Sequence, residues 1–583
     1  MTIPRIPGFM MLALLAACRR DQATHTPRTD PQLVLPQPFP DAARVEALAQ
    51  QPVAPLDPPA RRIFVEQWSL HGPGPTRTAA IVADDADATA LASLAAPGQR
   101  VTTAMGCYAR ELAAFVQQHD AQPSDDLSSW IGGRCGVGHV MPQVLFHRVG
   151  PRTASRLDPA KDGEALAPAL ARLGEAVDLG IGRFDDGKDA RLVIAGAPRR
   201  VTLDDIAMTA EDGRVTITGE SDAPIGWAIG YATDGEIGVS TCTPTAARRQ
   251  GPRAFALSCA VNPKDAQARI EVTIAAQNRL MGTTVADVWV SPDGSMPTAW
   301  TAQRFAVPAG EGERDASAWL TAINAVRQRA KLPAWTHARA QSDRVAALLP
   351  HLLAGGGQSA SYDEVALAML AGWDVEGVIR DGRLALSAVP LEVPLDRKVS
   401  AALSSPTFRS QVVSSEIATA AIAVHDMPAA GVSRLGIVGY SLFVDRDYTQ
   451  AEQQFLDTLD ADRGSRGLPP VVRAGGPRDR ARMAEAAARV RKGESVPSEE
   501  LQGLLDHFST ATGQTMRGAI FSTLRLDGFR PAFDGPLALA PQVIVLVGIA
   551  DWRPPGAAWG QHVIYVVFAV PGDHGGGAAA QRL

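Results

Sequence analysis

Long apolar runs, an excess of charge of one sign and known catalytic patterns are all lacking in this sequence of 583 residues. After the N-terminal segment, no apolar run approaches the roughly 20 residues of a membrane-spanning helix. The net charge of -6 is small for this length and gives no electrostatic reason to expect a nucleic-acid partner. Gly-x-Ser-x-Gly, His-Glu-x-x-His and Gly-x-x-x-x-Gly-Lys patterns are absent. The sequence therefore identifies no catalytic residue, no cofactor and no metal site.

Cysteine is also scarce, with five residues in the chain, and four of them fall into two local pairs, Cys107 with Cys135 and Cys242 with Cys259. Four cysteines allow three connectivities, and the local one keeps each bridge inside one domain, where it would stabilise by about 3 kcal/mol. Zinc binding is the alternative, but neither pair has a Cys-x-x-Cys spacing or a histidine cluster. We expect two local disulfides, formed in an oxidising compartment.

The fifth cysteine, Cys18, follows a segment with the pattern of an export signal. One arginine, an apolar run over residues 9–15 and two alanines precede it. The sequence Leu-Ala-Ala-Cys resembles the bacterial lipobox, which implies a lipoprotein signal over residues 1–18, palmitate on Cys18 and a membrane anchor. Because Arg19, and not aspartate, follows the cysteine, the outer membrane is favoured over the inner membrane. An ordinary signal peptide with a chance cysteine is the alternative.

The rest of the chain is too long for one hydrophobic core and predicts about four domains in a multidomain α+β protein. Residues 19–60 hold nine prolines, which favours an extended, semi-rigid tether that would hold the folded part off the membrane. Residues 61–193 combine strand-like and helical patterns in a mixed α/β domain with one disulfide. Residues 194–303 contain short, regularly spaced strands and predict a β-sandwich with the other disulfide.

Residues 304–447 and 448–575 are predicted to be two copies of one domain. Residues of the first copy recur in the second at a constant offset of 136 (456 − 320 and 469 − 333). The recurring positions are Leu320, Ile323, Arg327, Leu332 and Pro333, matched by Leu456, Leu459, Arg463, Leu468 and Pro469.

Three stretches of the first copy resemble the CAP superfamily (cysteine-rich secretory, antigen 5 and pathogenesis-related 1-like, also called SCP domain) in a degenerate bacterial form. Residues 323–333 resemble its opening helix, residues 370–373 its "aGy" segment, and residues 405–413 its "SPxHRxnil" motif. The second copy follows through its likeness to the first. The resemblance implies tandem α-β-α sandwiches and proteins that act by binding sterols, lipids, metals or protein surfaces.

The first copy departs from this family at two positions that would serve a metal. Phe408 stands where the family carries histidine, and Arg383 stands where it carries glutamate. Phenylalanine has no lone pair to offer, and arginine brings a fixed positive charge. We therefore expect residues 305–447 to lack the family's metal-dependent site.

The expected function is a non-catalytic binding or structural module at the cell envelope. Trp552 and Trp559 flank a Pro-rich turn and would form a binding surface for an envelope protein, a glycan or a lipid headgroup. Packing over the core of the sheet is the alternative for both rings. The rival function is an envelope hydrolase or peptidase with its site in residues 61–193. His139 and His147 lie in that range, but no third ligand accompanies them.

Overall fold

The computed structural model divides into two compact units, which we describe separately. The larger unit comprises Pro38–Val375 and Asp381–Leu442, and the smaller unit comprises Met1–Gln37, Glu376–Arg380 and Phe443–Leu583. The structure describes residues 28–29, 39–53, 61–70, 86–138, 140, 142–151, 156–185, 189–204, 207–209, 213–245, 251–277, 279, 281–291, 297–305, 307, 315–354, 360–373, 379–443, 447–523, 526, 529, 531–555, 557 and 560–571.

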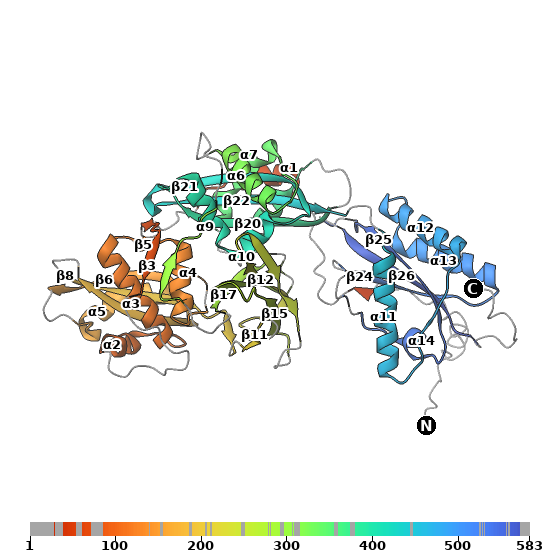
Figure 1. The fold of residues 1–583 in the computed structure, drawn as a ribbon, viewed down its shortest axis with the longest axis horizontal. Coiled ribbons are helices and arrows are strands. Elements are labelled where there is room, and N and C mark those ends of the chain that lie inside the picture. Colours follow the sequence, from red (N-terminus) through yellow and green to blue (C-terminus); the bar gives the residue numbers. More distant parts are fainter. Residues whose placement is uncertain are drawn as a thin grey trace, which may run out of the picture. The chain divides into compact units, whose positions relative to one another are not determined.

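The N-terminal domain of the larger unit is a four-stranded sheet with helices on both faces (Figure 1). Alternate residues of its strands enter two separate cores. Val193 and Ala195 pack with α3, whereas Leu192 and Ile194 pack with α2 and α5. The elements are α2 (Ala86–Leu94), β4 (Arg100–Val101), α3 (Thr103–His119), α4 (Asp125–Arg134), β6 (Gln143–Pro151), α5 (Pro159–Arg172), β7 (Val177–Asp185) and β8 (Asp189–Pro198).

Two pairs of short strands extend this domain. β2 (Arg62–Ile63) pairs with β5 (Gln122–Pro123), and β3 (Gln67–Ser69) pairs with β18 (Ala299–Thr301). The chain therefore returns to the N-terminal domain before residue 303, and β8 continues past residue 193. Both boundaries expected from the sequence cut through shared structure.

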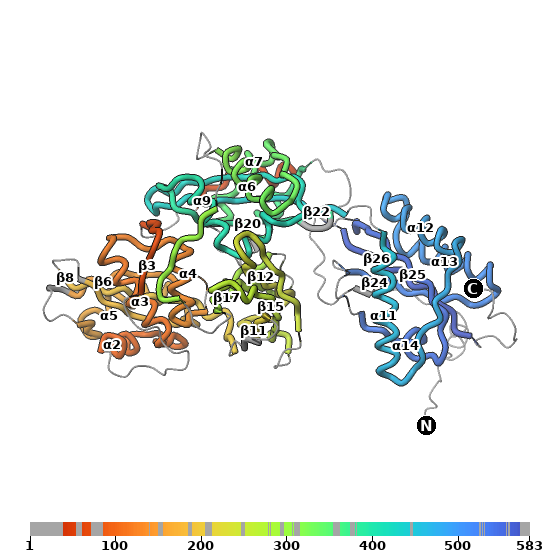
Figure 2. Tube along the Cα trace, in the orientation of Figure 1, coloured from red at the N-terminus to blue at the C-terminus, as the bar shows by residue number. Residues whose placement is uncertain are grey.

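A β-sandwich follows, with strand order β10-β11-β15-β14 in one sheet and β13-β12-β16-β17 in the other. In Figure 2 its path is the yellow to yellow-green part of the tube. The elements are β9 (Val201–Leu203), β10 (Ala207–Thr209), β11 (Arg214–Ser221), β12 (Ile225–Asp234), β13 (Gly238–Thr241), β14 (Thr243–Pro244), β15 (Ala254–Ala260), β16 (Ala268–Ala276) and β17 (Thr283–Val290).

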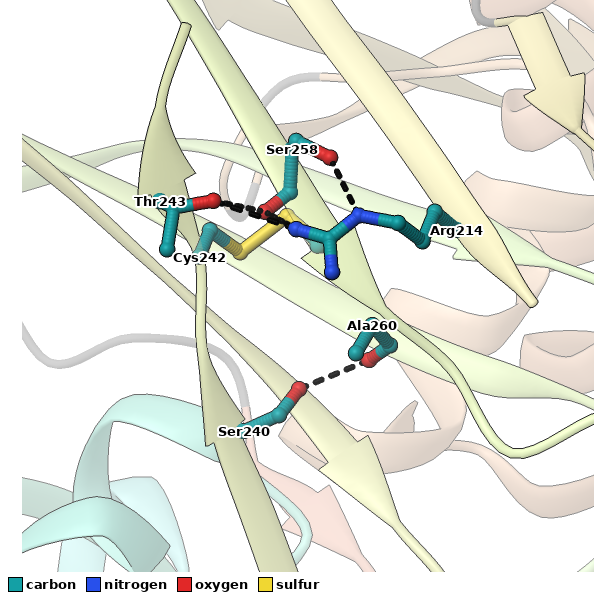
Figure 3. The surroundings of a disulfide bond; sticks show 7 residues. Arg214, Ser240, Cys242, Thr243, Ser258 and Ala260 are labelled. Carbon is teal, nitrogen blue, oxygen red and sulfur yellow. Dashed lines mark hydrogen bonds between the residues drawn. A yellow bond between two sulfur atoms is a disulfide. The ribbon is translucent and has the colours of Figure 1, made fainter. Parts of the chain in front are cut away.

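Cys242 lies where the chain passes from one sheet of the sandwich to the other, between β13 and β14. Its disulfide to Cys259 on β15 fixes this crossing. Figure 3 shows the polar contacts around it: Arg214 Nε donates to Ser258 Oγ (2.9 Å), and Ser240 Oγ donates to the carbonyl of Ala260 (2.7 Å). The bridge thus joins the two sheets at the point where the chain stops pairing with β12, through β13, and begins to pair with β15, through β14.

The other disulfide joins Cys107 on α3 to Cys135, the residue that caps α4. Both cysteines are buried, and they hold the two helices together beneath the sheet. The two bridges are the pairs that the sequence predicts.

The first copy completes the larger unit and has the strand order β19-β21-β22-β20. α7 packs on one face of this sheet and α6 on the other. Its elements are α6 (Ala316–Arg329), β19 (Thr336–His337), α7 (Arg339–Ala354), α8 (Ala360–Leu370), β20 (Ile379–Pro390), α9 (Leu395–Leu403), α10 (Pro406–Val412), β21 (Ile417–Met427), the 3-10 helix η2 (Pro428–Ala430) and β22 (Val432–Leu442).

The second copy forms most of the smaller unit and repeats this order as β23-β25-β26-β24. Figure 1 shows α12 and α13 on one side of the sheet and α11 on the other. Its elements are α11 (Thr449–Ser465), β23 (Val472–Arg473), α12 (Pro477–Arg491), α13 (Pro497–Thr512), β24 (Arg517–Thr523), α14 (Gly535–Leu539), β25 (Ile544–Trp552) and β26 (Gln561–Ala569).

The N-terminal domain has the same topology as the two copies, which the sequence did not reveal. In each domain a short strand pairs in parallel with the first strand of an antiparallel hairpin, and two helices connect the short strand to the outer edge strand. One backbone hydrogen bond, from the residue after the short strand to the hairpin, recurs in all three. These bonds join Thr102 to Leu179 (3.0 Å), Ala338 to Ala420 (2.9 Å) and Ala474 to Val545 (2.8 Å). The mixed α/β domain is therefore a third repeat.

Close packing of the helix after the short strand also recurs. Gly182 on β7 lies so near α3 that an added Cβ would come within 2.2 Å of the Ala109 carbonyl, and Gly548 on β25 similarly faces Met483 on α12. At the equivalent register of the first copy stands another small residue, Ala423, which is buried. At Gly182 the backbone of α3 crosses the strand, and at Gly548 the Met483 side chain fills the same space, so a small residue is needed at both positions.

The tether differs from the extended spacer expected for residues 19–60. It contains helix α1 (Ala42–Ala49), which begins at the N-cap Asp41 and buries Val45 and Leu48. α1 packs on α7 and α8 of the first copy, where Arg44 forms two hydrogen bonds with Glu364 (2.6 and 2.8 Å). Residues 42–49 contain no proline, so nothing in their sequence prevents a helix there.

A second part of the tether, β1 (Arg28–Thr29), pairs in parallel with β24 in the smaller unit. Cys18 itself lies outside the described residues. Within the described part of the chain, no helix is both long enough and apolar enough to cross a membrane.

Candidate functional site

Residues 405–413 of the first copy, which we call the motif segment, fold as α10 (Pro406–Val412) and its two flanking residues. Its N-cap, Ser405, accepts a hydrogen bond from the backbone N–H of Phe408 (3.2 Å), and Pro406 fills the first helical position, where no N–H donor is needed. Phe408 is 2% exposed and packs with Trp319 and Ile323 in the core between α6 and the sheet. The position at which the resemblance would place a histidine therefore belongs to the hydrophobic core.

The first turn of α10 holds a carboxylate from the β-sandwich. Glu271 Oε2 accepts hydrogen bonds from Ser405 Oγ (2.7 Å) and from the backbone N–H of Thr407 (3.0 Å). Glu271 is buried on β16. The motif segment thus binds a side chain of its own polypeptide, and this contact closes its outer face.

Arg269, on the same face of β16, neutralises that carboxylate. Its Nη2 lies 2.9 Å from Glu271 Oε1, and its Nε and Nη2 form a two-point contact with Asp287 on β17 (2.9 and 2.8 Å). Burial by itself lowers the pKa of Arg269, but Asp287 and Glu271 together outweigh that effect, so the pKa lies above its ordinary value. Arg269 Nη1 also donates to the carbonyl of Ser404 (3.2 Å), which ties the ion pair to the first copy.

The N-terminal domain reaches the same cluster through α4. Ser129 Oγ donates to Asp287 Oδ2 (2.5 Å) and accepts a hydrogen bond from Trp289 Nε1 (2.8 Å). Gly133, one turn later on α4, faces the Trp289 side chain so closely that an added Cβ would lie within 2.5 Å of the ring. We call Ser129, Arg269, Glu271, Asp287 and Ser405 the junction cluster, because it joins three domains.

A second arginine strengthens the contact between α10 and the sandwich. Arg409 Nε donates to the carbonyl of Leu403 (2.7 Å), and Nη2 donates to Gln303 Oε1 (2.8 Å). Nη1 approaches the carbonyl of Glu236 (3.4 Å), in the turn that joins β12 to β13. Burial lowers the pKa of Arg409 to about 10, with a smaller contribution from Arg269. Because oxygen acceptors surround it, this arginine acts as a cross-link between the domains.

Arg383, the other position at which the sequence departs from the motifs it resembles, lies on β20, and its Nη2 is 3.4 Å from Glu416 Oε2. The pair is partly exposed and lies apart from the contacts of α10 described above. Among the described residues, no group of three or more His, Cys, Asp or Glu side chains is arranged to hold a metal ion.

Two histidines of the larger unit do meet partners that resemble catalytic pairs. His337 Nε2 lies 3.0 Å from Ser342 Oγ, but that hydroxyl donates to the carbonyl of Ala338 and accepts from the N–H of Ile422 (3.0 Å each). With its one proton used, Ser342 is a structural residue that accepts from His337.

In the N-terminal domain, His147 Nε2 lies 3.3 Å from Asp162 Oδ1. Asp162 also accepts a hydrogen bond from the backbone N–H of Asp158 (2.9 Å). No nucleophile contacts this pair among the described residues, and His139 lies outside them. A histidine beside a carboxylate is two-thirds of the set that a hydrolase with a side-chain nucleophile needs, but the nucleophile is missing among the described residues.

Of the two tryptophans predicted to form a binding surface, the structure describes Trp552. Trp552 ends β25, is half-buried and packs with Met516 against the core of α12 and α13. Trp559 lies outside the described residues. Trp552 follows the packing alternative, and beside it the buried Asp551 accepts hydrogen bonds from Tyr448 (3.1 Å) and Arg491 (2.9 Å).

The second copy also contains a small hollow between α12, α13 and the sheet, with a volume of about 10 Å³ open to a water-sized sphere. Ligand sites usually measure 300–1,000 Å³, so this hollow is too small for a typical ligand. It is lined by Ala474, Gly475, Asp479, Phe508, Met516, Ile544, Leu546 and Val567.

Sequence reasoning missed the junction cluster, although a signal was present. Arg269 and Glu271 are charged residues at alternate positions of an otherwise apolar strand, and Asp287 interrupts the next apolar strand in the same way. Charges on one face of a buried strand require partners of opposite sign. That pattern indicates a buried ion pair, but it does not identify the domains that cover it.

Comparison with known proteins gives little further information. No protein-family model matches the chain, and no curated protein matches it. Among solved structures, the chain is similar to an extracellular protein containing a SCP domain from Bacillus anthracis str. Ames. The identity is 8%, the TM-score is 0.17, and the match covers 40% of this chain and 83% of that one. A TM-score this low carries no argument about the fold, which rests on the topology described above.

Proposed function

We propose that the chain is a lipid-anchored, non-catalytic scaffold of the bacterial cell envelope, built from degenerate CAP-type domains around a β-sandwich. The observation that supports this most is the contact of Glu271 with Ser405 and Thr407. A motif segment whose outer face is filled by the same chain has no open face for a ligand. Its inner face, at Phe408, is filled by the hydrophobic core.

The contacts between the domains of the larger unit favour a structural role, in which the chain holds its domains in one fixed arrangement. The junction cluster joins the N-terminal domain, the sandwich and the first copy through hydrogen-bonded side chains, with Arg269 shared between two carboxylates. Truncating one partner of such a cluster is costly, at about 3–5 kcal/mol, because it leaves an uncompensated buried charge. A buried, fully paired network of this kind favours one fixed arrangement of the three domains.

Export and anchoring rest on the N-terminal segment and on the disulfides. Buried disulfides persist in oxidising compartments such as the periplasm or the cell surface. The lipobox-like sequence before Cys18 adds a lipid and a membrane surface, with the outer membrane favoured by Arg19. An envelope protein, a glycan or a lipid would then be the partner of this scaffold.

The anchoring half of the proposal is tested by membrane fractionation of Cys18→Ser beside the wild type. The variant is expected to remain as precursor or to become soluble, whereas the wild type sediments with outer membrane. Equal membrane association of both proteins would refute the anchor.

The non-catalytic half is tested against the hydrolase alternative with His147→Ala, since His147 and Asp162 form the pair that favours that alternative. The wild type is expected to release no product from peptidoglycan or denatured protein. Product release that disappears in His147→Ala would establish the hydrolase instead.

A further inference from the structure

Helix α12 of the second copy is unusually basic for an amphipathic surface helix. Its fifteen residues contain five arginines, and its C-cap is Lys492. Arg478, Arg482, Arg489 and Lys492 follow one another at positions i, i+4, i+11 and i+14, so they lie along one side of the helix. Met483, Ala486, Ala487 and Val490 bury the side that faces the sheet. We call the four cations the basic stripe, and it extends over about 21 Å.

Acidic neighbours offset only half of this charge. Arg482 pairs with Glu485 (2.8 Å), and Arg489 pairs with the buried Glu500 (3.0 Å). Arg478 and Lys492 are exposed and have no ion-pair partner in the described part of the chain. The stripe therefore presents at least two uncompensated positive charges at its two ends.

The equivalent helices of the other two repeats differ in composition and in what covers them. α3 contains one arginine and no lysine, and α7 is covered by the tether helix α1. The basic stripe is thus a property of the second copy and not of the shared fold.

The tether brings the second copy close to the proposed lipid. β1 pairs with β24, and Arg28 follows Cys18 by ten residues (28 − 18). Ten residues of fully extended chain span at most about 35 Å. A domain held this near to a lipid anchor experiences a high effective concentration of membrane surface, so a weak contact becomes sufficient.

We infer that the basic stripe of α12 binds the anionic lipid headgroups of the membrane in which the chain is anchored. This inference rests on the proposed lipid anchor and specifies which domain lies against the membrane. Each Lys or Arg near an anionic surface raises partitioning about fivefold at physiological salt. Two uncompensated cations then contribute roughly 30-fold, which is weak for a free protein and effective for a tethered one.

The test uses the whole folded chain from residue 19 onward, which carries no lipid, and measures sedimentation with vesicles. One vesicle set is phosphatidylcholine alone, and the other contains phosphatidylglycerol as well. We expect binding to the anionic vesicles only, and loss of this binding in high salt because screening removes the attraction.

The variant Arg478→Gln/Lys492→Gln is expected to bind the anionic vesicles roughly 30-fold more weakly. Its matched control is Lys264→Gln/Lys331→Gln, which removes two exposed cations from the larger unit with the same change in net charge. The control is expected to bind as the wild type does.

Equal weakening of both double variants would overturn the inference, because it would show a dependence on net charge alone. Absence of binding to anionic vesicles would also overturn it. Neither result would affect the lipid anchor, which the fractionation of Cys18→Ser decides separately.

Discussion

Arg327 and Arg463 make the same hydrogen bond in two different domains. Each donates its Nε–H to the carbonyl of the proline six residues downstream, Pro333 at 2.8 Å and Pro469 at 2.9 Å. Both guanidinium groups then donate to carbonyls at the end of the helix before the terminal hairpin. The acceptors are Val412 (2.6 Å) and Leu537 (2.9 Å). Residues separated by the sequence offset of 136 therefore occupy equivalent positions in the two domains.

In the N-terminal repeat, Gln99 takes over this task. Its Nε2 donates to the carbonyls of Leu170 and Gly174, at the end of α5 (2.8 Å each). A buried amide in the loop before β4 thus reaches the end of the helix that precedes the hairpin, as the guanidinium on the opening helix does in each copy. The change of residue type explains why the third repeat escapes detection by residue identity.

We predict that Arg327→Ala and Arg463→Ala each destabilise their own copy by roughly 3 kcal/mol, because several buried carbonyls lose their donor. Hydrogen exchange of the terminal hairpin in each copy measures this locally, since the chain has several domains. Arg329→Ala, which removes an exposed arginine of α6, is the control and should cost less than 1 kcal/mol. Unchanged exchange in Arg327→Ala would contradict the assigned role.

Loss of the Cys242–Cys259 bridge should destabilise the sandwich by about 3 kcal/mol in the chain-entropy model. The reason is that the bridge fixes the passage between the two sheets. Unfolding of Cys242→Ala/Cys259→Ala in denaturant tests this, and peptide mapping without reduction should show the two local pairs in the wild type. Cross-paired peptides or free thiols would refute the pairing.

Docking of the tether helix α1 should weaken in acid. Hydrogen bonding from Arg44, followed by its charge, holds the pKa of Glu364 below its ordinary value. A carboxylate with a lowered folded pKa contributes stability above the ordinary value, near 4.3, and this contribution is lost as pH falls through the folded pKa. Hydrogen exchange of residues 42–49, corrected for intrinsic rates, should therefore rise below about pH 4.

In Glu364→Gln the same helix should exchange faster at neutral pH and show little further change on acidification. A wild-type helix that stays equally protected at pH 3 and pH 7 would show that the ion pair does not hold it.

Zinc should not bind stoichiometrically to the intact chain. Phe408 lies in the hydrophobic core, and Arg383 contacts Glu416, so neither position offers a metal ligand. Calorimetric titration should show only weak, non-saturating heats. A tight site of one zinc per chain would mean that metal ligands lie elsewhere and would reopen the question of an enzymatic activity.

The sequence predicts the elements whose signal can be seen in residue identity and spacing. The disulfides follow from the short spacing of the cysteines, the sandwich from strand alternation, and the duplication from residues repeated at a constant offset. The sequence did not reveal the third repeat, because the same fold can be packed by many different residues. Gly182 and Ala423 occupy equivalent positions, but they share only small size.

The junction cluster escaped for a different reason. Arg269 and Glu271 are two residues apart on one strand, but Ser129 and Ser405 lie more than a hundred residues away in opposite directions. A serine at a helix N-cap, such as Ser405, or inside a helix, such as Ser129, is so common that its sequence position does not predict a long-range partner. The tether helix was missed because prolines on either side of residues 42–49 dominated the composition of the segment.

The central claim is that the motif segment of the first copy is an internal docking surface, and a double-mutant cycle between Glu271 and Ser405 tests it most directly. Glu271→Ala, Ser405→Ala and the double variant are compared by the exchange free energies of the α10 amides. The hydrogen bond of 2.7 Å between a hydroxyl and a buried carboxylate predicts a coupling of about 2 kcal/mol. Additive effects, with no coupling between the two positions, would contradict the account.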